Sequence, residues 1–180
     1  MTLIAGSHVV GPDGSTLEIN TYREGVAAKV GHDLVIEVTR WEATVEVDAD
    51  GGVRAVALTA DPDSLQVRTG LHGLKPLTDK DRGEIKKNID SKVLGGAPIS
   101  FRSTSAGLTS GRLRVEGDLT IGTTTRPATF ELDAGEDGVV SGTLELVQTD
   151  FQIKPYRGLM GALKVRDEIE IVLDARLPAA

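Results

Sequence analysis

The feature of this sequence that most constrains its fold is a strict alternation of apolar and polar residues. The alternation is clearest between residues 111 and 121, where the apolar set is Leu113, Val115, Gly117, Leu119 and Ile121. Successive side chains of a β-strand point to opposite faces, so a period of two predicts a strand with one buried face. Sheets with one apolar and one solvated face are typical of antiparallel architectures.

The same period recurs along most of the chain and predicts nine further strands. They lie within residues 16–22, 25–30, 34–40, 42–48, 53–60, 99–105, 127–133, 142–147 and 168–177. Turn signals such as Ser110-Gly111 and Gly122-Thr123 separate many of them. Short strands joined by tight turns are typical of an antiparallel sandwich or barrel. A closed barrel covers the apolar face and leaves no sheet edge exposed, so we expect an all-β, antiparallel barrel.

One segment departs from this period and predicts a short helix over residues 78–94. Thr78 and Asp81 form a capping-box pattern at its start. Ile85, Ile89 and Val93 follow at helical spacing, and Gly95-Gly96 ends the segment. A single helix among strands is expected to cover one end or one side of the barrel, with its charged face in solvent.

Length and composition predict one domain over residues 1–180. The net charge of −7 opposes binding to a phosphate backbone, so we expect no nucleic-acid partner. The absence of cysteine excludes disulfides, thiolate metal sites and cysteine nucleophiles. No apolar run is long enough to span a membrane. The first residues have neither the basic start nor the apolar core of an export signal, which predicts a cytoplasmic protein.

Residues suited to catalysis are few. None of the common nucleophile, phosphate-loop or metalloprotease motifs occurs, and the chain has three histidines. If the protein were an enzyme, His32 and Asp33 would be the best candidates for its catalytic residues. The spacing of His32 and His72 does not support a metal site. We therefore expect no enzyme activity, no catalytic residues, no metal and no cofactor.

Two features concern the inside of the barrel. Ser103 and Ser105 share the face of Phe101, and Gln148 shares the face of Leu146, so these polar groups either orient a ligand head group or meet water at strand ends. The chain has six aromatic residues and an inward face made mainly of aliphatic ones. Either the aliphatic side chains pack the core completely, or the interior stays partly open for a long apolar ligand.

Five short motifs occur in a specific order along the chain. They are AAKVGH at residues 27–32, FRSTS at 101–105, GDLT at 117–120, TRPAT at 125–129 and DFQIK at 150–154. In order and spacing they resemble the YceI-like family, and the resemblance covers residues from about 15 to 178. It implies an extended lipocalin-like barrel that binds an amphiphilic isoprenoid or related lipid in its lumen, without enzyme activity.

The sequence departs from the family pattern in two places. The helical segment keeps Arg82 and Pro98 but lacks the family's histidine and aromatic cluster. The segment PYRGLMGALKVRDE, residues 155–168, replaces the usual short linker after DFQIK. Both departures concern the mouth of the barrel, so the identity of the ligand is not carried over from the family.

These inferences give a set of predicted ligand-binding residues. The residues expected to line the lumen or its mouth are Val30, Leu34, Ile36, Phe101, Leu119, Phe130, Leu146, Phe151, Ile153, Tyr156, Leu159, Met160 and Leu163. Lys154 and Arg157 are the expected contacts of an anionic head group. The alternatives are a packed barrel that acts as an interaction or scaffold module, including as a homodimer through an exposed sheet face, and an enzyme that uses His32 and Asp33.

Overall fold

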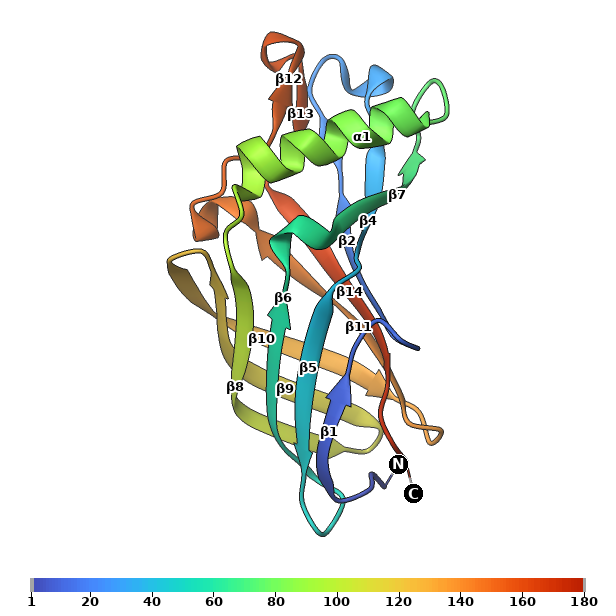
Figure 1. The fold of residues 1–180 in the computed structure, drawn as a ribbon, viewed down its shortest axis with the longest axis vertical. Helices are drawn as coiled ribbons and strands as arrows, with labels where there is room; N and C mark the ends of the chain where they lie inside the picture. The colour runs from blue at the N-terminus through green and yellow to red at the C-terminus, as the bar shows by residue number, and fades with distance from the viewer. Residues whose placement is uncertain (1, 180) are drawn as a thin grey trace.

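The computed structural model describes residues 2–179, and within them strands dominate, with one α-helix. The strands are β1 (Gly6–Val10), β2 (Thr16–Thr21), β3 (Arg23–Glu24), β4 (Asp33–Val38), β5 (Trp41–Val47), β6 (Val53–Ala60), β7 (Leu65–Leu71), β8 (Ile99–Thr109), β9 (Arg112–Ile121), β10 (Thr124–Ala134), β11 (Val139–Val147), β12 (Arg157–Gly158), β13 (Leu163–Val165) and β14 (Glu168–Arg176). The predicted all-β class is confirmed (Figure 1).

Eleven strands form one antiparallel sheet that curls around the interior. Their order is β1-β5-β6-β8-β9-β10-β11-β14-β2-β4-β7. The short strands β12, β13 and β3 form a second sheet at the end of the molecule that also carries the helix (Figure 1). Every pairing is antiparallel, as expected for strands with one apolar face.

A bent hairpin brings the two ends of the large sheet together. β4 runs into β5 through Thr39 and Arg40, and β6 runs into β7 through a 3-10 turn, Pro62–Ser64. Pairing continues across the bend, since the Thr39 amide donates to the Ser64 carbonyl at 3.2 Å and the Asp61 amide donates to the Arg40 carbonyl at 2.9 Å. Because β4 pairs with β2 while β6 pairs with β8, this hairpin closes the curl.

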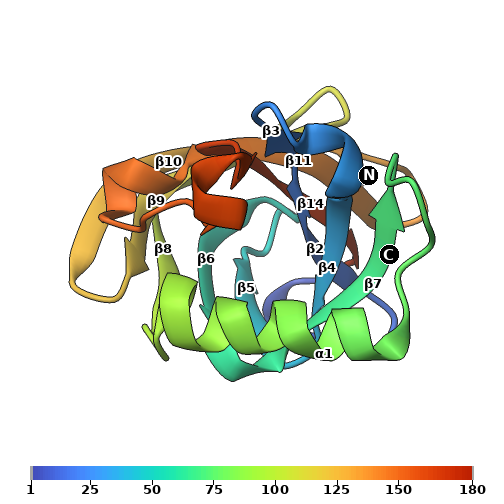
Figure 2. The same ribbon diagram turned by 90° about the horizontal axis from the view of Figure 1, so that it is seen from above.

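The prediction that closure leaves no sheet edge is wrong, since β1 and β7 each pair with one strand. The physical reason is the bend, which moves β7 away from β8 and leaves β1 alone beside β5. The helix packs beside β7 (Figure 2). Next to β1, Leu3 bridges Ala179, and the Ile4 amide donates to the Pro178 carbonyl at 2.9 Å, so the two ends of the described chain meet there.

The helix forms where the sequence predicts it. α1 (Asp79–Asn88) continues as one π-helical turn, Ile89–Leu94, and ends at Gly95 with φ of 59°. The capping box is present, because Thr78 Oγ1 accepts from the Asp81 amide at 3.2 Å and Asp81 Oδ2 accepts from the Thr78 amide at 2.9 Å. Seen from above, the helix runs along one side of the opening of the curled sheet, next to β7 (Figure 2). Within the described residues, no helix has both the length and the apolar character needed to cross a bilayer.

One predicted strand is wrong. Residues 25–30 form a turn and a 3-10 helix, Ala28–Val30, in place of a strand. Gly25 has a φ of +99°, and a Cβ there would lie 2.5 Å from the Ala162 carbonyl oxygen. The close approach of these two segments requires a backbone conformation that a strand does not provide.

The alternating apolar side chains face the interior as predicted. Buried residues come from most strands of the large sheet and include Leu17, Ile36, Val45, Val67, Phe101, Leu113, Val115, Leu119, Leu132, Val140 and Ala175. Phe101 meets Phe130 edge to face, with ring centroids 5.1 Å apart. The Phe101 ring lies over Gly117, where an added Cβ would come within 2.7 Å of it.

Candidate functional site

The interior of the curled sheet is not completely filled. A cavity of about 650 Å³ lies between the strands and α1. Small-molecule sites typically occupy ~300–1,000 Å³, so this volume suits a bound molecule. Composition was compatible with either a completely packed core or a partly open interior. The structure has a partly open interior.

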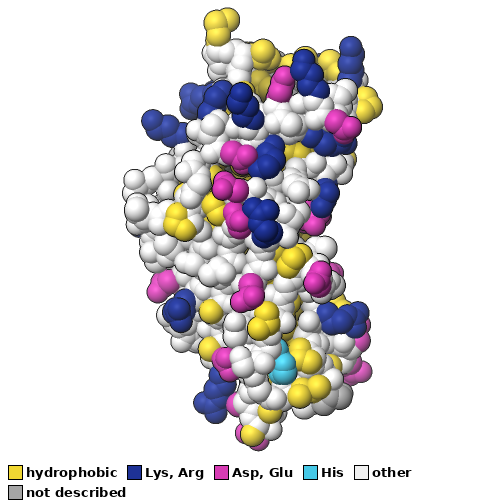
Figure 3. Space-filling view, in the orientation of Figure 1, with side chains coloured by type: hydrophobic (Ala, Val, Ile, Leu, Met, Phe, Trp, Pro, Cys, Tyr) yellow, Lys and Arg dark blue, Asp and Glu magenta, His cyan; other side chains and the backbone are white. Residues whose placement is uncertain are grey.

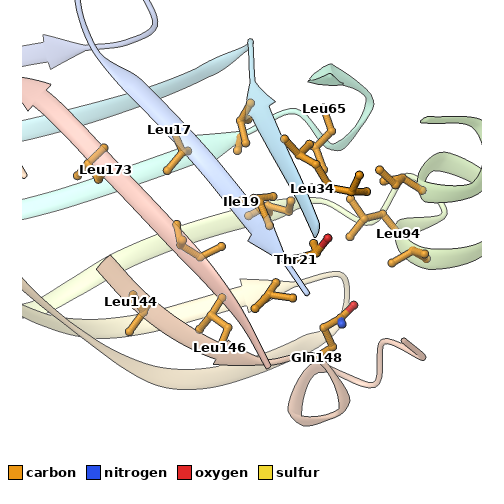
Figure 4. A pocket seen from close by; sticks show the side chains of 18 of the residues that line it. Leu17, Ile19, Thr21, Leu34, Leu65, Leu94, Leu144, Leu146, Gln148 and Leu173 are labelled. Atoms are coloured by element: carbon orange, nitrogen blue, oxygen red, sulfur yellow. The ribbon is translucent and has the colours of Figure 1, made fainter. Parts of the chain in front are cut away.

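The cavity wall is mostly aliphatic. Leu17, Ile19, Leu34, Leu144, Leu146 and Leu173 project into it from four strands (Figure 4). Ile85, Ile89 and Leu94 add apolar side chains from the helical segment, whose part in the wall the sequence analysis did not foresee. A wall of this kind fits a flexible hydrocarbon better than a polar metabolite, because it offers few hydrogen-bonding groups.

Ten of the thirteen predicted lumen residues lie on this wall. They are Val30, Leu34, Ile36, Phe101, Leu119, Phe130, Leu146, Ile153, Tyr156 and Leu163. Alternation places the strand residues there, and the hairpin of β12 and β13 brings in Tyr156 and Leu163. That these residues contact a ligand stays a prediction.

The other three predicted lumen residues lie elsewhere. Phe151 ends the 3-10 turn Gln148–Phe151 and is 6% exposed, but its side chain packs in the core and not on the cavity wall. Leu159 and Met160 are 59% and 107% exposed. Both have a positive φ, of 49° and 54°, in the tight turn that joins β12 to β13, and this turn directs them outward.

The two predicted head-group cations are not on the cavity wall either. Lys154 and Arg157 are exposed on the outside of the small sheet and its approach. The cations that line the cavity are instead Arg23, Lys75 and Lys164. They come from three segments far apart in the sequence, so only the topology brings them together, and no local pattern could have identified them.

Gln148 is the most buried polar side chain on the wall, at 6% exposure. Its Nε2 donates to the Arg166 carbonyl at 2.8 Å, which fixes the orientation of the amide. Among the described residues, no hydrogen bond is found to its Oε1. Figure 4 shows Gln148 and Thr21 as the labelled polar side chains among leucines and isoleucine. Gln148 therefore offers a hydrogen-bonding group to a molecule in the cavity.

The serine candidates do not serve this role. Ser103 Oγ accepts from the Val56 amide at 2.8 Å beside a β-bulge in β8, and Ser105 Oγ donates to Glu116 at 3.1 Å outside the barrel. Neither residue lines the cavity. The bulge between them breaks the shared face that simple alternation predicted.

His32 and Asp33 do not form a pair. His32 Nε2 lies 2.6 Å from the Lys75 carbonyl oxygen, whereas Asp33 accepts from the Arg23 amide at 2.8 Å and contacts His72 Nδ1 at 2.7 Å. Burial raises the pKa of Asp33, but the Arg23 amide and His72 outweigh it and hold that pKa below its usual value. Within residues 2–179, no cluster of three or more metal-ligating side chains is found.

Tyr22, next to the cavity residue Thr21, donates its hydroxyl proton to Glu170. This hydrogen bond, together with burial and the negative charge of Glu170, raises the pKa of Tyr22 to about 12. The Arg166 guanidinium lies 5.9 Å from the centre of the Tyr22 ring and acts in the opposite direction. The hydrogen bond between Tyr22 and Glu170 connects β14 to the residue that follows β2.

Comparison with known proteins identifies one family and several solved structures of similar fold. A model of the YceI-like domain matches residues 10–177. No curated protein matches the chain.

The crystal structure of Burkholderia cenocepacia BcnA is similar in fold. It aligns with a TM-score of 0.67 at 15% identity and covers 92% of this chain and 98% of its own. A mutant of the CJ YCEI protein, with a monobromobimane guest, aligns with a TM-score of 0.51 at 11% identity over 81% of this chain and 85% of its own. At these identities the two structures support the fold alone.

Proposed function

This chain belongs to the YceI-like family, and from that premise we propose that it binds an amphiphilic long-chain isoprenoid-like lipid in its cavity, to store or transport it without chemical change. The YceI-like fold is a β-barrel fold that binds hydrophobic ligands. The observation that carries the proposal is the aliphatic cavity of about 650 Å³ enclosed by the sheet and α1.

The chemistry of the wall supports a hydrocarbon as the buried part of the ligand. Burying apolar surface contributes roughly 25 cal/mol per Å², from which the cost of ordering the chain is subtracted. A flexible hydrocarbon loses rotational freedom on binding, so a branched or unsaturated chain, which has less freedom to lose, suits the site better. This is the physical argument for an isoprenoid-like chain.

The polar groups of the cavity support an amphiphile over a plain hydrocarbon. Gln148 supplies one buried amide, and Arg23, Lys75 and Lys164 line the part of the cavity formed by the loops and the small sheet. A ligand with a polar head satisfies these groups, while a plain hydrocarbon would leave Gln148 without a partner for its oxygen.

The two alternatives have less support. A packed scaffold module needs no cavity of this size. An enzyme centred on His32 and Asp33 needs these residues to act together, yet they are held by different partners. A homodimer stays a prediction.

The first experiment is native mass spectrometry of the purified protein, followed by organic extraction. We expect a stoichiometric lipid-sized adduct that solvent releases, or uptake of an added isoprenoid alcohol by the lipid-free protein. If neither an adduct nor uptake of added isoprenoids or fatty acids is found, the proposal is wrong.

A matched pair of variants on β11 tests the site of binding. Leu144 lines the cavity, whereas its neighbour Thr143 is exposed on the outside. We expect Leu144→Glu to weaken isoprenoid binding by about tenfold or more, because the carboxylate would lose its hydration beside the hydrocarbon. Thr143→Glu adds the same charge to the same strand and should leave binding unchanged. Circular dichroism checks that both variants fold, and full affinity in a folded Leu144→Glu protein contradicts binding in the lumen.

A further inference from the structure

The exposed apolar side chains of this protein are concentrated around the mouth of the cavity. Among residues 2–179, eight large hydrophobic residues are exposed, and six lie in three segments at this end: Val26, Val30, Leu71, Leu74, Leu159 and Met160. The other two, Ile4 and Val9, lie near the chain ends at the opposite end of the molecule (Figure 1). We call the three segments, residues 22–31, 71–94 and 153–166, the mouth segments.

The most exposed of these side chains belong to two turns whose backbones are connected by hydrogen bonds. Val26 is 96% exposed and Met160 is 107% exposed. The Ala27 amide donates to the Ala162 carbonyl at 2.9 Å, and the Ala162 amide donates to the Leu159 carbonyl at 3.1 Å. The turn that bears Val26 and the turn that bears Met160 are therefore joined in one unit, which displays both side chains to solvent.

The same segments carry a charge opposite to that of the rest of the chain. They contain 12 of the 20 Lys and Arg residues but five of the 27 Asp and Glu residues, so their formal charge is +7 and that of the remaining chain is −14. Residues 153–166 hold four basic residues and no acidic one. Figure 3 shows Lys and Arg side chains gathered toward the end that carries α1 and β12.

We propose that the mouth segments dock on the surface of an anionic lipid bilayer. Exposed apolar side chains with basic neighbours are the combination that holds a protein at a membrane interface, because the apolar groups enter the acyl boundary while the cations meet anionic head groups. The acidic remainder of the molecule is repelled by the same surface, so the charge distribution orients the protein with its cavity toward the bilayer.

The docking surface is continuous with the cavity. Val30 belongs to the exposed set and also lines the cavity. Leu163 and Lys164 of β13, which are half-buried, line the cavity as well. A lipid that leaves the bilayer at this point enters the apolar cavity without crossing bulk water. This last step rests on the proposed function, whereas the docking itself does not.

Vesicle co-sedimentation tests the proposal with the full chain. The vesicles contain equimolar phosphatidylcholine and phosphatidylglycerol, with no isoprenoid lipid, and the reference vesicles contain phosphatidylcholine alone. We expect binding to the anionic vesicles at low salt and a clear loss of binding at high salt, because screening weakens the charge attraction. Absence of binding to the anionic vesicles overturns the proposal.

A matched pair of double variants tests the surface. Val26→Ser with Met160→Ser removes two apolar side chains at the mouth end, and Ile4→Ser with Val9→Ser removes two exposed ones at the opposite end. We expect the first protein to bind vesicles about tenfold or more weakly and the second to bind like the unchanged chain. Equal effects of the two double variants contradict docking through the mouth segments.

Sedimentation velocity and native mass spectrometry separate the remaining outcomes. If the unchanged chain is a dimer that the Val26/Met160 double variant abolishes, and vesicle binding is absent, the surface is an interface with a second copy and the bilayer proposal falls. Lumen binding is measured on the same proteins without vesicles. Failure to dock therefore leaves the lipid-binding proposal standing, and failure to bind lipid leaves the docking result standing.

Discussion

At the scale of single residues, Gly117 shows how the barrel admits its few aromatic rings. The Phe101 ring occupies the space over this glycine and meets Phe130 edge to face. A Cβ at residue 117 would lie 2.3 Å from the Arg102 carbonyl oxygen, so both backbone and ring would have to move. The glycine is thus part of the packing of the aromatic pair and not a break in the strand pattern.

We expect Gly117→Ala to lower the free energy of unfolding by about 2 kcal/mol, in the range of overpacked cores. Urea unfolding followed by circular dichroism measures the change. Gly107→Ala on β8 is the control, because nothing lies within 4 Å of an added Cβ there, and it should change stability little. Equal stability of Gly117→Ala and the unchanged chain would contradict the packing described.

Tyr22 gives a pH dependence with a definite sign. Its pKa is raised to about 12 in the folded protein by the hydrogen bond to Glu170, and lies near 10 in an unfolded chain. The stabilisation from this hydroxyl is complete below pH 10 and is lost as the pH rises through about 12. Ultraviolet titration of tyrosinate in the Tyr156→Phe protein should therefore show the remaining tyrosine titrating well above its ordinary value, and an ordinary midpoint would refute the interaction.

At the scale of elements, α1 forms one side of the cavity wall. It is stabilised by the capping box at its N-terminus and by contacts with β7. Its Ile85 and Ile89 line the cavity, while none of its residues is fully buried. The helix therefore depends on the capping box of Thr78 and Asp81 more than a helix buried in a core would.

We expect Thr78→Ala to destabilise this helix by about 1 kcal/mol and to raise amide hydrogen exchange in α1 more than in β9. Hydrogen-exchange mass spectrometry resolves the two elements. Lys80→Ala, at an exposed position on the same helix, is the control and should leave exchange nearly unchanged. Uniform exchange changes across the whole protein would show that α1 does not open separately.

The elements also show what sequence alone can predict. Alternation identified the long strands because one face of each is buried, and helical spacing with the capping box identified α1. The period failed at residues 25–30, where contact with Ala162 imposes a turn, and at Leu159 and Met160, whose positive φ turns them outward. Such outcomes depend on contacts with distant segments, so no local pattern contains them.

At the scale of the whole molecule, the candidate site divides in the same way. The wall residues contributed by strands, such as Leu34 and Leu146, follow from alternation plus closure of the sheet. The set of Arg23, Lys75 and Lys164 at the cavity does not, because it depends on how β3, β13 and the loop between β7 and α1 come together at one end of the barrel. The concentration of exposed apolar residues at one end is likewise a property of the topology.

The cavity has a consequence for the volume of the protein. The part of the cavity that is lined by aliphatic side chains is internal void volume, and unfolding removes such volume. Hydrostatic pressure should therefore unfold the lipid-free protein more readily than the loaded one, because a bound chain replaces the void with close-packed atoms. The pressure at which the barrel unfolds should therefore report whether a lipid occupies the cavity, and this measurement needs no label on the lipid.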